Sequence, residues 1–236
     1  MVPYWTEKQA QDATVFRKFA YSKTDRFRLR KEAEILSSIH HPRIPRLLDF
    51  DEGRTHSELI AQFIPGVSMG SLLRNGEAVP DAWRSEITEA VESLHYSGWN
   101  HADIKPANIL IHGSDAYLVD LDSAARHGEP YSTIPDRSFT PSFAAWRQVA
   151  GRGEVSVSDD LFSLALTDFV GSYRRHPFNG HSIFEFFLLG ADRLSNMVSK
   201  FGKDLMERVC QQYEVMCRLE PSPVETVSPN WRKVRK

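Results

Sequence analysis

Hydrophobic and polar residues alternate near the start of the chain, through residues 13–20 (ATVFRKFA), and this pattern predicts a β-strand that ends near Ala20. A helix is expected next, because apolar residues recur at helical spacing until the breaker HHP at 40–42. The apolar positions of this helix are Phe27, Leu29, Ala33, Leu36 and Ile39. Two more strands are predicted at 46–52 and 57–64, and the Pro/Gly stretch PGVSMG then ends this unit of the chain.

The pattern changes after residue 65 to longer helical segments. Residues 80–98 begin with Pro and Asp, place apolar side chains along one face and end at a glycine, which together predict a helix. Residues 108–120 (NILIHGSDAYLVD) predict a hairpin that turns at HGSD. Further helices are expected at 158–170, 182–201 and 203–219.

The bulk composition removes several classes of function. The 236 residues are 41% hydrophobic with a formal net charge of −2, so a folded core is expected and no global charge draws the chain to nucleic acid or an anionic membrane. No stretch resembles a signal peptide or a membrane span, which favours a cytoplasmic location and leaves export into a host cell as an open alternative. Cys210 and Cys217 are too few for a disulfide scaffold or a zinc site and are expected to be buried free thiols.

One polar stretch, HADIKPAN at 101–108, carries the side chains that phosphoryl transfer needs. This chemistry requires a carboxylate that orients the attacking hydroxyl, a cation near the phosphoryl group and oxygen ligands for Mg²⁺. Asp103 and Lys105 supply the first two. Asn108 and Asp120, at the two ends of the predicted hairpin, supply the metal ligands.

These residues make the chain resemble the protein kinase family. HADIKPAN is similar to the family's H-R-D-x-K-x-x-N loop, VDLD stands where D-F-G is expected, and the likeness extends from about Lys18 to Leu166. The resemblance implies an α+β, bilobal fold with a reduced N-lobe of one sheet and one helix and a mainly helical C-lobe. A single kinase-like domain is therefore expected over residues 1–236, with the N-lobe at about 1–65 and the C-lobe at about 66–236.

The resemblance also implies a nucleotide site. VFRK is similar to V-A-I-K, which makes Lys18 the residue for the ATP phosphates and Glu32 its partner, with Glu34 as the alternative partner. AQFIPGV resembles the hinge that contacts adenine, where Gln62 and Ile64 would offer backbone groups.

Two further segments match the family downstream. FTPSFAAWR places Thr140 where serine/threonine kinases have a threonine that bonds the catalytic aspartate and lysine. SDDLFSLAL places Asp160 where a buried carboxylate braces the catalytic loop.

The chain departs from the family pattern at several points. No glycine occurs before Gly53, so the Gly-rich loop over the phosphates is expected to be missing or rudimentary. Ala102 replaces the arginine of H-R-D, so regulation by loop phosphorylation is not expected. Asp122 replaces the glycine of D-F-G and adds a carboxylate beside the metal site. Arg147 replaces the glutamate of A-P-E, and Glu225 is its expected partner in a charge-reversed pair.

The resulting hypothesis is a minimal, bacterial-type serine/threonine protein kinase that uses ATP with Mg²⁺ or Mn²⁺. Lys105 and Thr140 favour a protein substrate with a serine or threonine acceptor, and neither nucleic acid nor a membrane span is expected. The sequence leaves the oligomeric state open. Two alternatives also stay open: a lipopolysaccharide-sugar or small-molecule kinase, favoured by DLD and the short length, and a pseudokinase binding module, favoured by the missing glycines.

Overall fold

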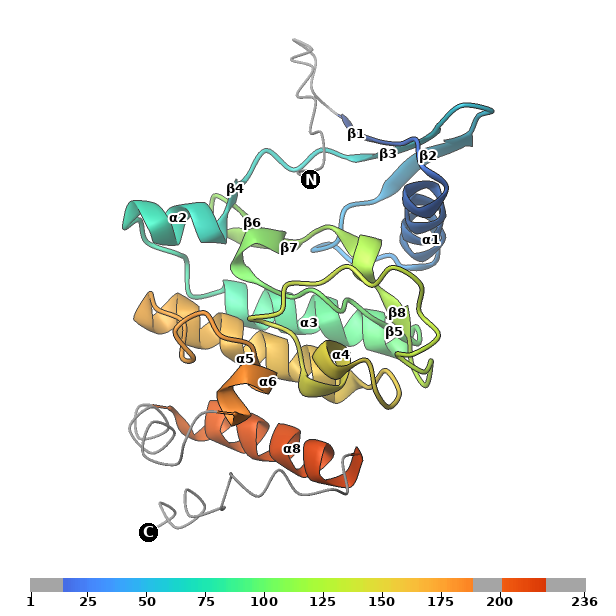
Figure 1. Ribbon diagram of the computed structural model, residues 1–236. Coiled ribbons are helices and arrows are strands. Elements are labelled where there is room, and N and C mark those ends of the chain that lie inside the picture. Colours follow the sequence, from blue (N-terminus) through green and yellow to red (C-terminus); the bar gives the residue numbers. More distant parts are fainter. Residues whose placement is uncertain (1–14, 189–200, 220–236) are drawn as a thin grey trace.

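The computed structural model describes residues 15–188 and 201–219, and it divides them into an upper part built on a sheet and a lower part built on helices (Figure 1). The strands are β1 (Val15–Ala20), β2 (Leu47–Glu52), β3 (Ser57–Gln62), β4 (Val67–Ser68), β5 (Trp99–Asn100), β6 (Ile109–His112), β7 (Asp115–Leu118) and β8 (Ala125–Arg126). The α-helices are α1 (Lys23–Ser38), α2 (Met69–Asn75), α3 (Trp83–Tyr96), α4 (Trp146–Ala150), α5 (Val157–Tyr173), α6 (Ile183–Phe187) and α8 (Lys203–Leu219). Short 3₁₀ helices cover Pro106–Asn108 and Leu121–Ser123.

The upper part is an antiparallel sheet in the order β1-β3-β2 with α1 packed against it (Figure 1). Helix α1 begins earlier than its apolar pattern suggests, because Ser22 accepts a hydrogen bond from the Asp25 N–H and caps the helix. Its buried face is formed by Leu29, Glu32, Ala33, Ile35 and Leu36. Phe27, which the periodicity placed on that face, is instead 52% exposed. The buried face of α1 therefore excludes Phe27 and includes Ile35, which was not among the predicted positions.

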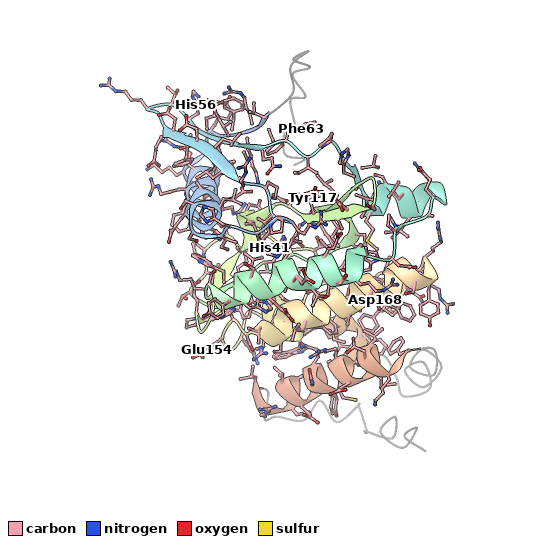
Figure 2. The ribbon with its side chains drawn as sticks, turned by 180° about the vertical axis from the view of Figure 1, so that it is seen from behind. His41, His56, Phe63, Tyr117, Glu154 and Asp168 are labelled. Carbon is pink, nitrogen blue, oxygen red and sulfur yellow. The ribbon has the colours of Figure 1, made fainter. Side chains whose placement is uncertain are left out.

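A tight connection joins the sheet to the rest of the molecule. After β3 the chain crosses to β4, which pairs with the β6–β7 hairpin in the order β4-β6-β7. Gly66 lies so close to β6 that a Cβ atom there would be 2.8 Å from the Ile111 carbonyl oxygen. In the reverse view, Phe63 on this connection lies above Tyr117 of the hairpin (Figure 2). Glycine is therefore required where the connection meets the hairpin.

The lower part stacks α3 and α5 beneath the hairpin, with α4 at the level of α5 and with α6 and α8 below them (Figure 1). One apolar cluster is continuous from α1 and the sheet through the hairpin to α3. A second cluster joins α4, α5, α6 and α8 and is rich in aromatic rings, among them Trp146, Phe162, Phe178 and Phe186. Burying each such side chain contributes about 1.5–3 kcal/mol, so the two clusters fix the helices that carry the loops between them.

The predicted strands, the hairpin and the helices at 80–98, 158–170 and 203–219 are confirmed, whereas two more predictions are wrong besides that of Phe27. The helix expected over 182–201 ends at Phe187 in its described part, and residues 189–200 lie outside the described residues. Neither cysteine forms a disulfide bond, but Cys210 is only partly buried and Cys217 is exposed, so the expected burial of both thiols is wrong. The short helices α2 and α4 were not predicted, because segments of 7 and 5 residues are too brief for periodicity to be read.

No helix within residues 15–188 and 201–219 combines the length and the apolar character that crossing a bilayer demands.

Candidate active site

The first group of predicted site residues meets where α1 faces the end of the hairpin. Lys18 Nζ donates to Glu32 Oε2 at 2.9 Å and to Asp120 Oδ1 at 2.8 Å. Lys18 comes from β1, Glu32 from α1 and Asp120 from the turn after β7. Glu34, the alternative partner, is exposed and pairs with Arg126 instead. The fold therefore brings one cation from the sheet between two carboxylates from separate elements.

Burial and charge act in opposite directions in this group. Burial would lower the pKa of Lys18, but Glu32, Asp120 and Asp122 together raise it well above its ordinary value. For Asp120, burial favours the neutral form, yet the charge of Lys18 and its hydrogen bond hold the pKa of Asp120 below its ordinary value. Burial raises the pKa of Glu32 in spite of Lys18. At neutral pH, Lys18 is thus protonated and Asp120 ionised.

Asp120 sits at a special backbone position. Its φ of 69° is left-handed, an uncommon conformation for a residue other than glycine. The N–H of the next residue, Leu121, points to Glu32 Oε1 at 3.4 Å. Glu32 thus contacts both Lys18 and the backbone beside Asp120, which links α1 to the turn.

The second group lies in the loop between β5 and β6. Asp103 is buried and accepts from the Thr140 N–H on Oδ1 at 2.8 Å and from Lys105 Nζ on Oδ2 at 2.5 Å. Lys105 Nζ also donates to Thr140 Oγ1 at 2.7 Å. These contacts match the arrangement expected from FTPSFAAWR. They fix the carboxylate, the ammonium and the Thr140 hydroxyl relative to one another.

Asn108 joins this loop to the hairpin. Its Nδ2 donates to the Asp103 carbonyl at 2.9 Å and to Asp103 Oδ2 at 3.2 Å. The main-chain carbonyl of Asn108 accepts from the Val119 N–H at 3.0 Å, so Asn108 and Asp120 lie at the same end of the hairpin. His101 spans the same gap, because its Nε2 bonds the Val119 carbonyl at 3.0 Å while its Nδ1 accepts from the Asp103 N–H at 3.3 Å.

The two oxygen donors suit a hard cation. Asn108 donates both of its side-chain hydrogen bonds to Asp103 through Nδ2, which leaves its Oδ1 available. Lys18 contacts Asp120 through Oδ1, which leaves Oδ2 of Asp120 available. Mg²⁺ is usually held by one or two protein oxygens and completes its shell with water and phosphate. Among the described residues no group of three or more His, Cys, Asp or Glu side chains could hold a metal ion by itself. The donor set therefore fits a magnesium–nucleotide site rather than an all-protein metal cage.

Asp160 braces the loop from below, as its position in SDDLFSLAL predicted. It is fully buried and accepts from the N–H groups of His101 at 2.8 Å and Ala102 at 2.9 Å. His95 of α3, which the sequence analysis did not single out, bonds the same carboxylate through Nε2 at 2.9 Å.

The expected hinge residues lie at the end of β3 and directly after it. Gln62 is the last residue of that strand, and its N–H donates to the Arg46 carbonyl at 2.8 Å. Ile64 is buried, and its carbonyl accepts from the Gly66 N–H at 2.8 Å. The Ile64 carbonyl is therefore engaged within the connection, which leaves its N–H as the group a ligand could use.

Asp159 is the principal residue that the sequence analysis missed. Arg147 Nε donates to Asp159 Oδ1 at 3.1 Å, and Tyr131 Oη donates to Asp159 Oδ2 at 3.0 Å. The pattern Ser156-x-x-Asp159 before a long apolar helix is a capping-box signature, and that box is present at the start of α5. Glu225, the partner expected for Arg147, lies outside the described residues. Within them, the carboxylate that pairs with Arg147 is Asp159.

Asp122 has a local role in the described structure. It follows Asp120 in a 3₁₀ turn, and its Oδ1 accepts from the Ser123 hydroxyl at 3.1 Å. Its negative charge contributes to raising the pKa of Lys18 and opposes the lowering of the pKa of Lys31 by burial.

Comparison with known proteins agrees with this geometry. The model of the protein kinase domain family matches residues 5–223. Serine/threonine-protein kinase pkn2 of Myxococcus xanthus is 30% identical over 165 residues, which are 65% of this chain and 20% of that protein. Serine/threonine-protein kinase PknD of Mycobacterium tuberculosis is 31% identical over 146 residues, or 59% of this chain and 22% of that protein. Serine/threonine-protein kinase ssp1 of Schizosaccharomyces pombe is 25% identical over 214 residues, or 80% and 32% respectively. The chain spans about a third or less of the length of each of these relatives.

Proposed function

Because the chain belongs to the protein kinase family, we propose that it transfers the γ-phosphoryl group of ATP to a serine or threonine hydroxyl of a protein. The observation that carries this proposal is the way Asp103 is held. Its carboxylate has donors on both oxygens, from Thr140, Lys105 and Asn108, while Lys105 also bonds the Thr140 hydroxyl. Such a carboxylate is fixed in direction before an acceptor arrives.

Each residue of the site then has a role. Asp103 orients the acceptor hydroxyl and accepts its proton, and Lys105 neutralises negative charge on the phosphoryl group in the transition state. Lys18 holds ATP phosphate oxygens, and Glu32 positions Lys18. The hinge backbone at Gln62 and Ile64 accommodates the base.

Magnesium, or manganese in its place, would be held by Asn108 Oδ1 and the Asp120 carboxylate. When bound, such an ion neutralises phosphate charge and fixes the direction of the phosphate chain. Lys18 holds Asp120 ionised through the contact at 2.8 Å, so the chain keeps this ligand charged for the ion at neutral pH. The Asn108 amide is fixed by its bonds to Asp103, which couples the metal ligand to the catalytic carboxylate.

The contact of Lys105 with Thr140 favours a protein acceptor over a sugar or other small molecule. Thr140 belongs to the segment FTPSFAAWR, which resembles the peptide-accepting part of serine/threonine kinases. The named relatives are serine/threonine-protein kinases, which supports the same acceptor class. The joint presence of Asp103, Lys105, Asn108 and Asp120 argues against a pseudokinase.

Two substitutions test the assignment. Asp103→Ala should lower kcat by about 10²–10⁴-fold with little change in Mg·ATP affinity, because this carboxylate acts on the acceptor. Asp120→Ala should abolish transfer and also weaken Mg·ATP binding strongly. Asp81→Ala, which removes a fully exposed carboxylate, is the matched control and should leave both quantities unchanged.

The measurements are turnover with labelled ATP and nucleotide affinity by calorimetry, with generic protein acceptors and sugar acceptors offered in parallel. Retention of most activity in Asp103→Ala would refute the role of that residue. Transfer to sugars alone would point to the small-molecule alternative, and nucleotide binding without transfer to any acceptor would point to a pseudokinase.

A further inference from the structure

Gln148 is a buried polar residue whose side chain reaches the catalytic loop. It lies in the short helix α4 and is 3% exposed, and its Nε2 donates to the Ala102 carbonyl at 2.6 Å. A glutamine at this position carries no signature of catalysis in the sequence. Its partner, however, is the residue that directly precedes Asp103.

Ala102 adopts a conformation that needs support. Its φ of 62° is left-handed, which places the Cβ of an L-residue too close to its own backbone. Strained residues of this kind persist only where their surroundings hold them. The Ala102 N–H is held by Asp160 Oδ1 at 2.9 Å, and its carbonyl is held by Gln148. The two peptide groups that flank the Ala102 Cα are thus braced by two different helices, α5 and α4.

We propose that Gln148 is a positioning residue that fixes the catalytic loop at Ala102 and thereby sets the direction of the Asp103 carboxylate. This inference rests on the proposed phosphoryl-transfer function of Asp103. Kinases of the family usually have an arginine at the position of Ala102, and that arginine can bind a phosphorylated residue of the loop. Here alanine leaves that position without charge, and the neighbouring amide of Gln148 supplies a neutral brace that requires no modification.

The brace is connected to the segment that leads to Thr140. Arg137 in that segment donates to the main-chain carbonyl of Gln148. Thr140, a few residues later, donates through its N–H to Asp103. Helix α4 is therefore linked to the catalytic carboxylate along two routes, one through Ala102 and one through Thr140.

Gln212 provides a control of the same chemical type. It is a glutamine that is 1% exposed, and its Oε1 accepts from the Trp146 N–H at 2.8 Å, so it also bonds backbone at α4. It contacts the helix and not the catalytic loop. A role of Gln148 in folding alone would give similar results at both positions, whereas a positioning role distinguishes them.

The first test compares Gln148→Met with Gln212→Met, since methionine keeps the volume and removes the amide. For Gln148→Met we expect kcat to fall about tenfold, because one buried carbonyl loses its donor, and KM for ATP to stay within about twofold. Gln212→Met should lower the unfolding temperature and leave kcat unchanged. An unchanged kcat in Gln148→Met, or an equal fall in both variants, would overturn the proposal.

Gln148→Glu provides a rescue test that does not depend on tolerance of methionine. An ionised carboxylate would face the Ala102 carbonyl without a proton to donate, whereas a protonated one restores the bond. The activity of Gln148→Glu relative to the parent should therefore rise as the pH is lowered from 8 to 6. Charged groups beside this contact include Arg137, which donates to the Gln148 carbonyl, and Asp160, which accepts from the Ala102 N–H. Asp103 and Arg147 are the charged neighbours in sequence. Gln212→Glu measured over the same pH range is the control. A ratio that is independent of pH would contradict the proposal.

Amide hydrogen exchange separates this inference from the proposed function. Exchange at Ala102 and Asp103 should be faster in Gln148→Met than in the parent and unchanged in Gln212→Met. If the parent transfers phosphate to no acceptor, the proposed function fails, but the exchange experiment still tests the brace. Equal exchange rates at 102 and 103 in the parent and Gln148→Met would show that Gln148 does not hold the loop.

Discussion

Replacing Arg147 by methionine should destabilise the protein by an amount that grows as the pH rises through about 6. Methionine keeps most of the length of the side chain and removes the guanidinium that bonds Asp159 and Ser158. Asp159 is then left as a buried carboxyl without its cation, with only the Tyr131 hydroxyl and the Ser156 N–H as donors.

The sign and the size of this change in the free energy of unfolding follow from the pKa of Asp159. Burial raises this pKa from 3.8 to about 6, although Arg147 acts to lower it. The folded state therefore binds the proton more tightly than the unfolded chain, and ionising Asp159 removes about 3 kcal/mol of stability as the pH rises from about 4 to 6. Without Arg147 the folded-state pKa rises further, so the loss continues at higher pH. We expect the variant to be less stable than the parent by about 3–5 kcal/mol at pH 8, the cost of a stranded buried charge. At pH 5, where the carboxyl is mostly protonated in both folded proteins, we expect about 1–2 kcal/mol.

The assay is denaturant unfolding of parent and variant at pH 5, 6, 7 and 8. Arg84→Met is the matched control, because Arg84 also pairs with an aspartate, Asp168, but both side chains are more than 40% exposed. The control should lose less than about 1 kcal/mol, with no trend across this pH range. A pH-independent loss in Arg147→Met, or one as small as that of Arg84→Met, would refute the reasoning.

Two further predictions concern the nucleotide site and regulation. Lys18→Met should weaken Mg·ATP binding and lower kcat/KM by at least about 10²-fold. Glu32→Gln should lower kcat/KM less, because Asp120 still holds Lys18. Equal losses of kcat/KM in the two variants, measured by steady-state kinetics, would contradict this order. A variant with alanine at four hydroxyl residues of the loop before α4 should keep its activity toward an exogenous protein within a few-fold of the parent, because Ala102 cannot bind a phosphate group. The four residues are Ser132, Thr133, Ser138 and Ser142. A collapse in rate would reveal an activating phosphorylation site.

The sequence predicted the regular elements well where one physical signal dominated. Alternation identified β1, the turn sequence HGSD identified the hairpin, and the helix at 80–98 was recognised by its apolar face and its terminal glycine. The error at Phe27 has a specific cause in helix geometry: at about 100° per residue, Phe27 lies on the side of α1 opposite Leu29 and Leu36, so its side chain faces solvent. An apolar residue near the start of a helix therefore belongs to the buried face only where its angle, and not its hydrophobicity alone, places it there.

The candidate site was predictable where residues are close in sequence and much less so where helices bring them together. Asp159 and Asp160 are neighbours, but successive residues on a helix point about 100° apart, so one faces Arg147 and the other faces the catalytic loop. Only the three-dimensional packing of α4 against α5 assigns each its partner. Gln148 was missed for a related reason, because an amide has no distinctive chemistry until its partner, the Ala102 carbonyl, is known.

The close approach of Gly66 to Ile111 limits how the connection after β3 can change. Not even a Cβ fits between residue 66 and the hairpin whose ends carry Asn108 and Asp120. A second contact reaches the same hairpin from the connection between α1 and β2, because the Arg43 carbonyl accepts from the Leu118 N–H at 2.8 Å. The sheet and the hairpin are thus tied at two points that are far apart in the sequence. A side chain added at residue 66 would therefore displace β6, and with it the residues at the ends of the hairpin, rather than the connection alone.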